Sequence, residues 1–237
     1  MPFDPARVRA ILFDLDGTLV DTDDDYIRRA GEFMRGLAFL FPQRDPTRFL
    51  RWSLMISESP LNLLMGMPDW LGVDAPLARL ADWFTRRRPA GPPPTFTLMA
   101  GMDAALPRLA QRYKLGIVTA RSDGRARVFL NQFGLAAHFG AVAGALTAPH
   151  TKPYPDPVIW AAHALDVPVE SCLMVGDTTV DILAGKRAGA QTAGVLCGFG
   201  ERRELERTGA SIILEQTTEL EKALAEARDP KGLAKRP

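Results

Sequence analysis

The sequence predicts an α/β protein with a doubly wound, Rossmann-like parallel sheet and a second, smaller all-helical domain inserted into it. Three observations lead to this prediction: apolar runs alternate with amphipathic segments after residue 95, the first apolar run ends at acidic Asp14, and residues 21–94 contain no good strand. Alternation of strands and helices indicates a parallel sheet covered on both faces. We therefore divide the chain into a core, residues 1–20 and 95–237, and a cap, residues 21–94.

The first strand is expected at residues 10–13, a compact run that is apolar on both faces, as buried parallel strands are. The segment Asp14–Thr18 indicates a turn at the carboxyl end of this strand. In the insert that follows, apolar residues recur at helical spacing. The insert ends in the breaker-rich stretch Pro89–Pro94, which predicts a linker or hinge.

The remaining core alternates regularly between the two kinds of element. We expect helices over residues 102–112, 122–133, 156–165, 180–188 and 218–227, and strands over residues 115–118, 141–143, 172–175, 192–196 and 211–214. Ser122 or Asp123 is suited to cap the second of these helices, and Gly189 to end the fourth. The polar tail from Arg228 to Pro237 is expected to fray.

Composition indicates a soluble globular protein. Of the 237 residues, 46% are hydrophobic and 24% are charged, and a net charge of +1 disfavours nucleic acid as a partner. No signal peptide and no apolar run long enough to span a membrane are visible. Because two cysteines, Cys172 and Cys197, cannot form a disulfide framework, we expect a reducing compartment and a cytoplasmic location. Cys172 is expected to be a small buried hydrophobic residue.

Polar side chains gather where the expected strands end. They are Asp14, Asp16, Thr119, Asp177 and Asp181, with Lys152 in a proline-rich connection. Open parallel sheets bind ligands at this edge. Clustered carboxylates tolerate proximity when a cation lies between them, oxygen ligands favour Mg²⁺, and a lysine offers a positive charge to a phosphate. The sequence therefore predicts a phosphoryl-transfer site.

Four motifs, in order, resemble those of the haloacid dehalogenase-like hydrolase superfamily, in its phosphatase branch with a helical cap, similar to phosphoglycolate phosphatase-like enzymes. They are FDLDGTLVDT at residues 13–22, Thr119 at a strand end, Lys152 before Pro153, and GDTTVD at residues 176–181. One such motif alone is weakly specific, whereas four in order cover most of the chain outside the insert.

The resemblance implies a catalytic role for several residues. Asp14 resembles the nucleophile that forms an aspartyl-phosphate, and Asp16 resembles the general acid/base. Thr119 and the backbone amide of Ala120 would bind the transferring phosphoryl group. Lys152 would neutralise its oxygens and fix Asp14.

The resemblance also implies a metal site. The sequence departs from the family pattern in one place. Mg²⁺ would be bound by the carboxylates of Asp14 and Asp177 and by the carbonyl of Asp16, and Asp181 would support it. Many relatives carry Asn after the strand-ending Thr, where this chain has Ala120–Arg121. Arg121 is therefore a candidate contact to the substrate.

The chemistry disfavours two other branches of the superfamily. Dehalogenase-type members do not place an acid two residues after the nucleophile, because a departing halide needs no proton. Phosphonatase-type members use a cap lysine, and residues 21–94 contain no lysine. Asp16 therefore favours cleavage of a P–O bond.

The predicted function is Mg²⁺-dependent hydrolysis of a small phosphorylated metabolite, with neither nucleic acid nor membrane as a partner. Two alternatives stay open. One is a phosphomutase of the same superfamily that acts on a sugar phosphate, and the other is a non-catalytic ligand-binding protein on the same fold. The sequence leaves open whether the protein is a monomer or a homodimer.

Overall fold

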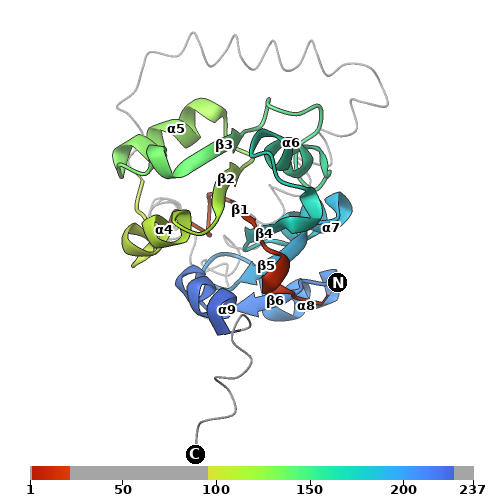
Figure 1. Cartoon of the computed structure of the whole chain (residues 1–237). Coiled ribbons are helices and arrows are strands. Elements are labelled where there is room, and N and C mark those ends of the chain that lie inside the picture. Colours follow the sequence, from red (N-terminus) through yellow and green to blue (C-terminus); the bar gives the residue numbers. More distant parts are fainter. Residues whose placement is uncertain (1, 22–95, 227–237) are drawn as a thin grey trace, which may run out of the picture. The chain divides into compact units, whose positions relative to one another are not determined.

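The computed structural model describes residues 2–21 and 96–226, which form a parallel sheet with helices packed on it (Figure 1). Of the predicted cap, residues 21–94, only Asp21 belongs to this described part. The predicted hinge at Pro89–Pro94 and the tail from Arg228 lie outside it as well. The helical character of the cap and the domain boundaries therefore stay predictions.

Within the described residues, the sheet contains six parallel strands in the order β3-β2-β1-β4-β5-β6. The strands are β1 Ala10–Phe13, β2 Lys114–Val118, β3 Phe139–Ala143, β4 Cys172–Gly176, β5 Gln191–Val195 and β6 Ile212–Leu214. The chain adds β2 and β3 on one side of β1 and then crosses back to add β4, β5 and β6 on the other side. Parallel sheets bind ligands where the strand order reverses in this way, at the carboxyl ends of the strands. This point lies between β1 and β4, whose onward connections run to opposite sides of the sheet.

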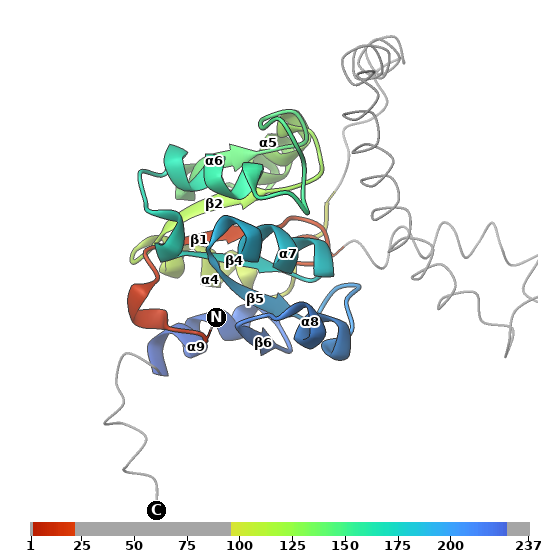
Figure 2. The ribbon, with the colours of Figure 1, turned by 90° about the vertical axis from the view of Figure 1, so that its right-hand side faces the viewer.

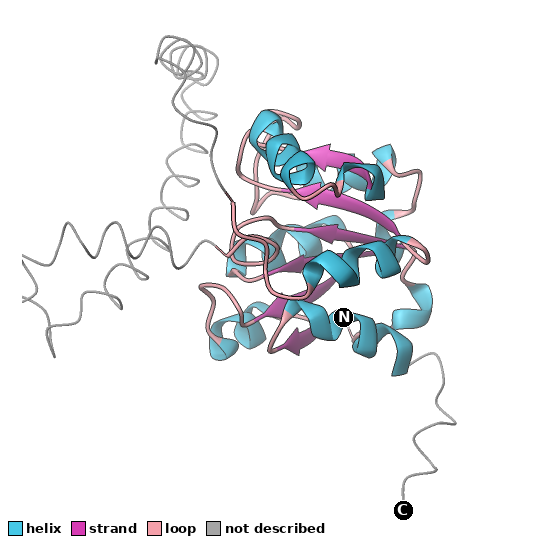
Figure 3. Cartoon of the chain, turned by 90° about the vertical axis from the view of Figure 1, so that its left-hand side faces the viewer, coloured by secondary structure: helices cyan, strands magenta, loops and turns pink. Residues whose placement is uncertain are grey.

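Alternate residues of β1 enter two different hydrophobic cores, because successive side chains of a strand point to opposite faces. Ile11 and Phe13 pack in the cluster that includes residues of α4, α5 and α9, whereas Ala10 and Leu12 pack with residues of α6 and α7. The helices are α4 Met102–Ala110, α5 Asp123–Gln132, α6 Asp156–Ala164, α7 Thr179–Ala188, α8 Arg202–Thr208 and α9 Leu220–Glu226. Helices thus cover both faces of the sheet (Figures 2 and 3). The doubly wound parallel sheet is confirmed.

The predicted core elements are confirmed, with bounds that shift by no more than about two residues at either end. Gly189 ends α7 in the left-handed conformation, with φ of 87°, as expected for a helix-ending glycine. None of the described helices has both the length and the apolar character needed to cross a membrane.

Helix α8 was not predicted from the sequence. Its seven residues, RRELERT, bury only Leu205, so no apolar stripe marks the helix. The available signal is Gly209, which ends α8 with φ of 90°. A short, charged helix of this kind is fixed by its packing and not by a periodic pattern.

The prediction that a side chain of Ser122 or Asp123 caps α5 through a hydrogen bond is wrong. Ser122 occupies the N-cap position with extended backbone, but its side chain makes no capping hydrogen bond. The carboxylate of Asp123 instead accepts hydrogen bonds from the hydroxyl of Thr147, at 2.9 and 3.0 Å. The side chain of Asp123 thus ties the start of α5 to the loop after β3.

Cys172 is buried at the first position of β4, as predicted. Burial raises the pKa of its thiol to about 12, with a smaller contribution from Glu170. This cysteine is therefore protonated at neutral pH and behaves as a small packing residue.

Candidate active site

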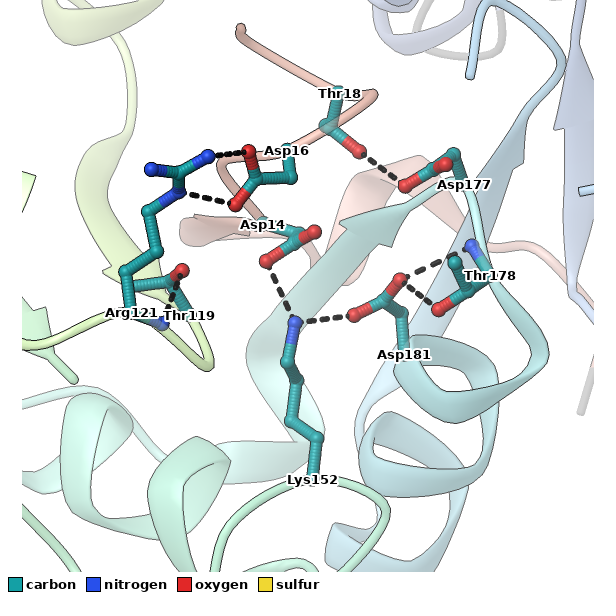
Figure 4. Close-up of polar contacts among 9 residues, drawn as sticks. All are labelled: Asp14, Asp16, Thr18, Thr119, Arg121, Lys152, Asp177, Thr178 and Asp181. Atoms are coloured by element: carbon teal, nitrogen blue, oxygen red, sulfur yellow. Dashed lines mark hydrogen bonds and ion pairs between the residues drawn. The ribbon is translucent and has the colours of Figure 1, made fainter. Parts of the chain in front are cut away.

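The polar residues predicted from the sequence gather beyond the carboxyl ends of β1, β2 and β4 (Figure 4). Asp14 follows β1, and its backbone amide donates to the carbonyl of Val175 in β4, at 2.8 Å. Thr119 follows β2, and its amide donates to the carbonyl of Ala143 in β3, at 2.9 Å. The sheet register therefore fixes the backbone beneath both side chains.

Lys152 joins two carboxylates in the buried part of the site. Its ammonium group donates to Oδ1 of Asp14 and to Oδ1 of Asp181, each at 2.6 Å. The side chains of Lys152, Asp14 and Asp181 are 6%, 9% and 0% exposed. We call these three residues the buried triad. Their ion pairs are shielded from water, so each charge is felt strongly by its neighbours.

The charges of the buried triad influence one another. Burial by itself would lower the pKa of the Lys152 ammonium, but the carboxylates of Asp14 and Asp181 outweigh it and raise that pKa. Burial raises the pKa of the Asp14 carboxyl well above its usual range, Lys152 opposes this rise, and Asp181 and Asp16 add to it. Lys152 is therefore a permanent cation. Additional positive charge would favour the ionised form of Asp14.

Three buried carboxylates are arranged as a candidate metal site. Asp14, Asp177 and Asp181 each offer an oxygen, and these oxygens lie within 4.8 Å of one another. Oxygen-only donors of this kind suit a hard cation such as Mg²⁺. Because the three carboxylates carry more negative charge than the single Lys152 ammonium can balance, a bound cation would also balance the local charge. The residues present therefore fit a divalent metal ion.

Asp177 is fixed by its surroundings. Its Oδ1 accepts a hydrogen bond from the hydroxyl of Thr18 at 3.2 Å, and its Oδ2 accepts one from the backbone amide of Phe199 at 2.8 Å. A Cβ atom at Gly17 or Gly198 would collide with the same carboxylate. The backbone thus approaches Asp177 closely from two loops, and only glycine permits this approach.

Asp181 is placed by the start of α7. Its Oδ2 accepts hydrogen bonds from the backbone amide of Thr178 at 3.1 Å and from the Thr178 hydroxyl at 2.7 Å. A carboxylate at the third helical position that bonds back to the N-cap residue is a capping box. Oδ1 remains directed at Lys152. The helix start therefore orients Asp181, which in turn orients the lysine.

The carboxylate of Asp16 contacts Arg121, whereas its predicted role as general acid/base requires contact with the reacting oxygens. Nε and Nη2 of Arg121 donate to Oδ2 and Oδ1 of Asp16, each at 2.5 Å. The carboxylate of Asp16 thus points toward Arg121 and not toward Lys152 (Figure 4). Both residues are singled out by their motifs, but their pairing is not predictable from the sequence, because they are 105 positions apart.

The loop after β2 places Thr119 and Arg121 side by side. The backbone amide of Arg121 donates to the hydroxyl oxygen of Thr119 at 3.1 Å. Since the hydroxyl accepts this bond, its own hydrogen can be donated to another group. The side chain of Ala120, between them, is exposed. The expected contacts of Thr119, Ala120 and Arg121 to a substrate stay predictions.

Three contributors to the site were not identified as such from the sequence. Thr18 and the amide of Phe199 hold Asp177, and Thr178 holds Asp181. Thr18 and Thr178 lie inside the two acidic motifs, so their spacing to the carboxylates was available. Phe199 lies in a glycine-containing loop after β5 and carries no such signal, since it acts through its backbone.

Comparison with protein families gives a match to a known family model. Residues 8–189 match the model described as haloacid dehalogenase-like hydrolase. The matched stretch includes every residue of the site except Gly198 and Phe199, which follow it.

Comparison with curated proteins gives relatives along most of the chain. A pyrophosphatase PpaX from Anoxybacillus flavithermus is 30% identical and covers 90% of this chain and 95% of its own. A phosphoglycolate phosphatase from Xanthomonas campestris pv. campestris is also 30% identical and covers 90% of this chain and 94% of its own.

Solved structures share the same architecture. A HAD family hydrolase from Deinococcus radiodurans, with bound phosphate and sodium, superposes with a TM-score of 0.64 at 24% identity, and covers 94% of this chain and 97% of its own. A hydrolase from Pseudomonas syringae gives a TM-score of 0.64, also at 24% identity, with 92% and 98% covered. At this identity the likeness concerns the fold.

Proposed function

The chain belongs to the haloacid dehalogenase-like hydrolase family, and from this premise we propose that it is a phosphatase that hydrolyses a small phosphorylated metabolite with Mg²⁺, through an aspartyl-phosphate. The observation that carries the proposal is the buried triad beside Asp177, at the carboxyl edge of the sheet. The relatives named pyrophosphatase and phosphoglycolate phosphatase support phosphate release as the reaction. We further propose a cytoplasmic location and no nucleic-acid or membrane partner.

The metal would be held by the carboxylates of Asp14 and Asp177 and by the backbone carbonyl of Asp16. When bound, Mg²⁺ supplies positive charge that balances the buried carboxylates and the phosphoryl oxygens. Asp181 contributes indirectly, because it fixes the position of the Lys152 ammonium.

In the first step, an oxygen of the Asp14 carboxylate attacks phosphorus, and the bond between phosphorus and the leaving oxygen breaks. Asp16 donates a proton to that oxygen, so the product leaves with a neutral hydroxyl group in place of the ester. The Lys152 ammonium, the Thr119 hydroxyl and the backbone amide of Ala120 would stabilise the charge on the phosphoryl oxygens. An aspartyl-phosphate on Asp14 results.

In the second step, water attacks phosphorus and Asp16 accepts a proton from it. The bond between the Asp14 oxygen and phosphorus breaks, inorganic phosphate is released, and the Asp14 carboxylate is restored. Each step needs Asp16 within hydrogen-bond reach of the reacting oxygen. Asp16 must therefore leave its contact with Arg121 during the cycle.

Phosphate release from p-nitrophenyl phosphate and from a panel of phosphorylated metabolites tests the proposal. Activity should require Mg²⁺ and disappear in excess chelator, and Ca²⁺ should inhibit, because its larger and looser coordination misplaces the attacking oxygen. Full turnover by protein shown to be metal-free by elemental analysis would exclude the proposed metal role. Conversion of a hexose 1-phosphate to an isomer without phosphate release would favour the phosphomutase alternative.

A further inference from the structure

We propose that Arg121 determines specificity by selecting substrates that carry a second anionic group close to the scissile ester oxygen. The inference rests on the proposed phosphatase function and names a substrate class for the same site. It is carried by the bidentate contact between the Arg121 guanidinium and the Asp16 carboxylate.

In the observed arrangement, both oxygens of Asp16 are directed at Arg121. Each of its two oxygens accepts a charge-assisted hydrogen bond from Arg121 at 2.5 Å. A general acid must bring one of its oxygens to within about 2.6–3.2 Å of the oxygen that it protonates. The pair must therefore separate before the first step, and what replaces Asp16 at the guanidinium decides how readily this happens.

The guanidinium of Arg121 has a second support that does not depend on Asp16. Its Cζ lies 5.5 Å from the ring centroid of Phe96, within the range of a cation–π contact. Phe96 is itself fixed, because the Gln132 side chain accepts from its amide at 3.2 Å and donates to its carbonyl at 2.8 Å. The ring also packs edge-on against Phe129, with centroids 5.7 Å apart. The cation therefore keeps its place when Asp16 moves away.

An anion on the substrate can take the place that Asp16 vacates. A carboxylate or a phosphoryl group matches the planar donor fork of a guanidinium. Such a substrate offers the guanidinium an anion in exchange for Asp16, whereas a neutral leaving group offers it no charge. Because Asp16 must reach the leaving oxygen from this place, the second anion has to lie close to that oxygen.

The substrate class is therefore a phosphorylated compound whose leaving group carries a carboxylate or a phosphoryl group beside the scissile oxygen. Phosphoglycolate and pyrophosphate, which appear in the names of the relatives, are compounds of this kind. The two differ in the second anion, so they distinguish a carboxylate preference from a phosphoryl preference.

The test compares kcat/KM for phosphoglycolate, for its neutral amide, for pyrophosphate and for p-nitrophenyl phosphate. Wild type should prefer phosphoglycolate or pyrophosphate to the two substrates without a second anion. Arg121→Gln should reduce this preference by roughly 10- to 100-fold, the scale of a hydrogen-bonded pair of charges. Arg121→Lys keeps the charge but not the fork, and should give an intermediate preference. Arg125→Gln removes a charge from an exposed position of α5 and should leave the preference unchanged.

Each outcome separates this inference from the proposed function. A wild type that releases phosphate from none of the substrates overturns the phosphatase proposal itself. A wild type that hydrolyses only the substrates without a second anion, or equal losses on all substrates in Arg121→Gln, overturns the role of Arg121 alone. General damage to the fold would lower all four rates together and would also lower the melting temperature.

Discussion

Two groups of charged residues in the site differ in burial but not in contact length. The buried triad is linked by 2.6 Å contacts between side chains that are at most 9% exposed. Arg121 and Asp16 are linked at 2.5 Å, but their side chains are 24% and 16% exposed. The segments that hold them differ as well: Asp14 directly follows β1, Asp181 lies in α7 and Lys152 lies in a proline-rich loop, whereas Asp16 and Arg121 lie in the loops after β1 and β2.

This difference in burial indicates that the two groups have different roles in the proposed reaction. Separating buried charges is costly, so the triad is arranged before a substrate arrives. A pair that is partly exposed, such as Arg121 and Asp16, separates at lower cost, because solvent can take over part of each charge. The groups proposed for attack are therefore held more firmly than the group proposed for proton transfer. Substitutions in the buried triad and in the pair of Asp16 and Arg121 should therefore have clearly different effects.

The largest effect is expected in the buried triad. Asp14→Asn preserves the shape of the side chain and an oxygen that can accept from Lys152, but it removes the anionic nucleophile. Turnover of every phosphate ester should fall by roughly 10⁴-fold or more, as for other residues that form a covalent intermediate. Phosphate release measures the loss, and an unchanged melting temperature shows that the fold persists. Residual turnover near the parent rate would remove Asp14 from the nucleophile role.

A smaller effect that depends on the substrate is expected for Asp16→Asn. The loss of a general acid/base costs roughly 10²–10⁴-fold in rate. An alkyl phosphate needs protonation of its leaving oxygen, so its first step should slow. Nitrophenolate departs as an anion, so with p-nitrophenyl phosphate only the second step should fail.

Rapid-quench kinetics of Asp16→Asn should then show a burst of about one nitrophenol per active site, followed by slow turnover. Asp14→Asn serves as the control and should give no burst. Parent rates on both substrates in Asp16→Asn would contradict the distinction between the buried triad and the pair of Asp16 and Arg121.

An effect of intermediate size is expected from a substitution of Thr18. This residue belongs to neither group, but it holds Asp177 in the candidate metal site. Thr18→Val removes the hydrogen bond to Oδ1 of Asp177 and keeps nearly the same volume. Loss of a partner that orients a metal ligand should weaken Mg²⁺ binding by roughly 10–100-fold. Calorimetric titration with Mg²⁺ measures the shift, with Thr208→Val, in α8, as the matched control. Equal Mg²⁺ affinity in the two variants would show that Asp177 needs no such support.

The smallest effect is expected for a pair on the surface. Arg108 donates to Glu221 at 2.6 Å, and this contact lowers the pKa of the Glu221 carboxyl. A lowered pKa in the folded state stabilises the fold above the ordinary glutamate pKa of about 4.3, and this contribution is lost as the pH falls through the folded-state value. Wild type should thus be slightly more stable than Glu221→Gln at pH 7, and the difference should vanish in strong acid.

Urea unfolding at both pH values and at two salt concentrations measures this difference, which should also shrink in high salt. A difference that survives at low pH would have to come from packing and not from charge. Such a result would also weaken the argument that burial makes the buried triad behave differently from the pair of Asp16 and Arg121.

Much of the fold and of the site was predictable because it depends on local patterns. The apolar run at residues 10–13 and the glycine at 189 each mark an element by themselves. The acidic residues at strand ends follow from the sheet edge that they share. The structure brings Asp14, Lys152, Asp177 and Asp181 together as the motifs indicated.

The rest depends on contacts that no local pattern encodes. The pairing of Asp16 with Arg121 arises because two turns face each other across the sheet edge. Phe199 acts through a backbone amide, which every residue except proline has. Helix α8 has too little apolar surface to show a period. The predicted cap lies outside the described residues, so its boundaries are still to be tested.

The central place of β1 has a consequence for the biosynthesis of the protein. This strand is made first, but its two neighbours are β2 and β4, and Ala10 of β1 pairs with Lys114 and Cys172. At a ribosomal rate of about 5–20 residues per second, the second neighbour emerges roughly 8–30 seconds after β1. Until then, one side of a wholly apolar strand has no partner in the sheet. The sheet around β1 should therefore stay incomplete until β4 has been made, and Asp14 should meet Asp177 and Asp181 only after that point.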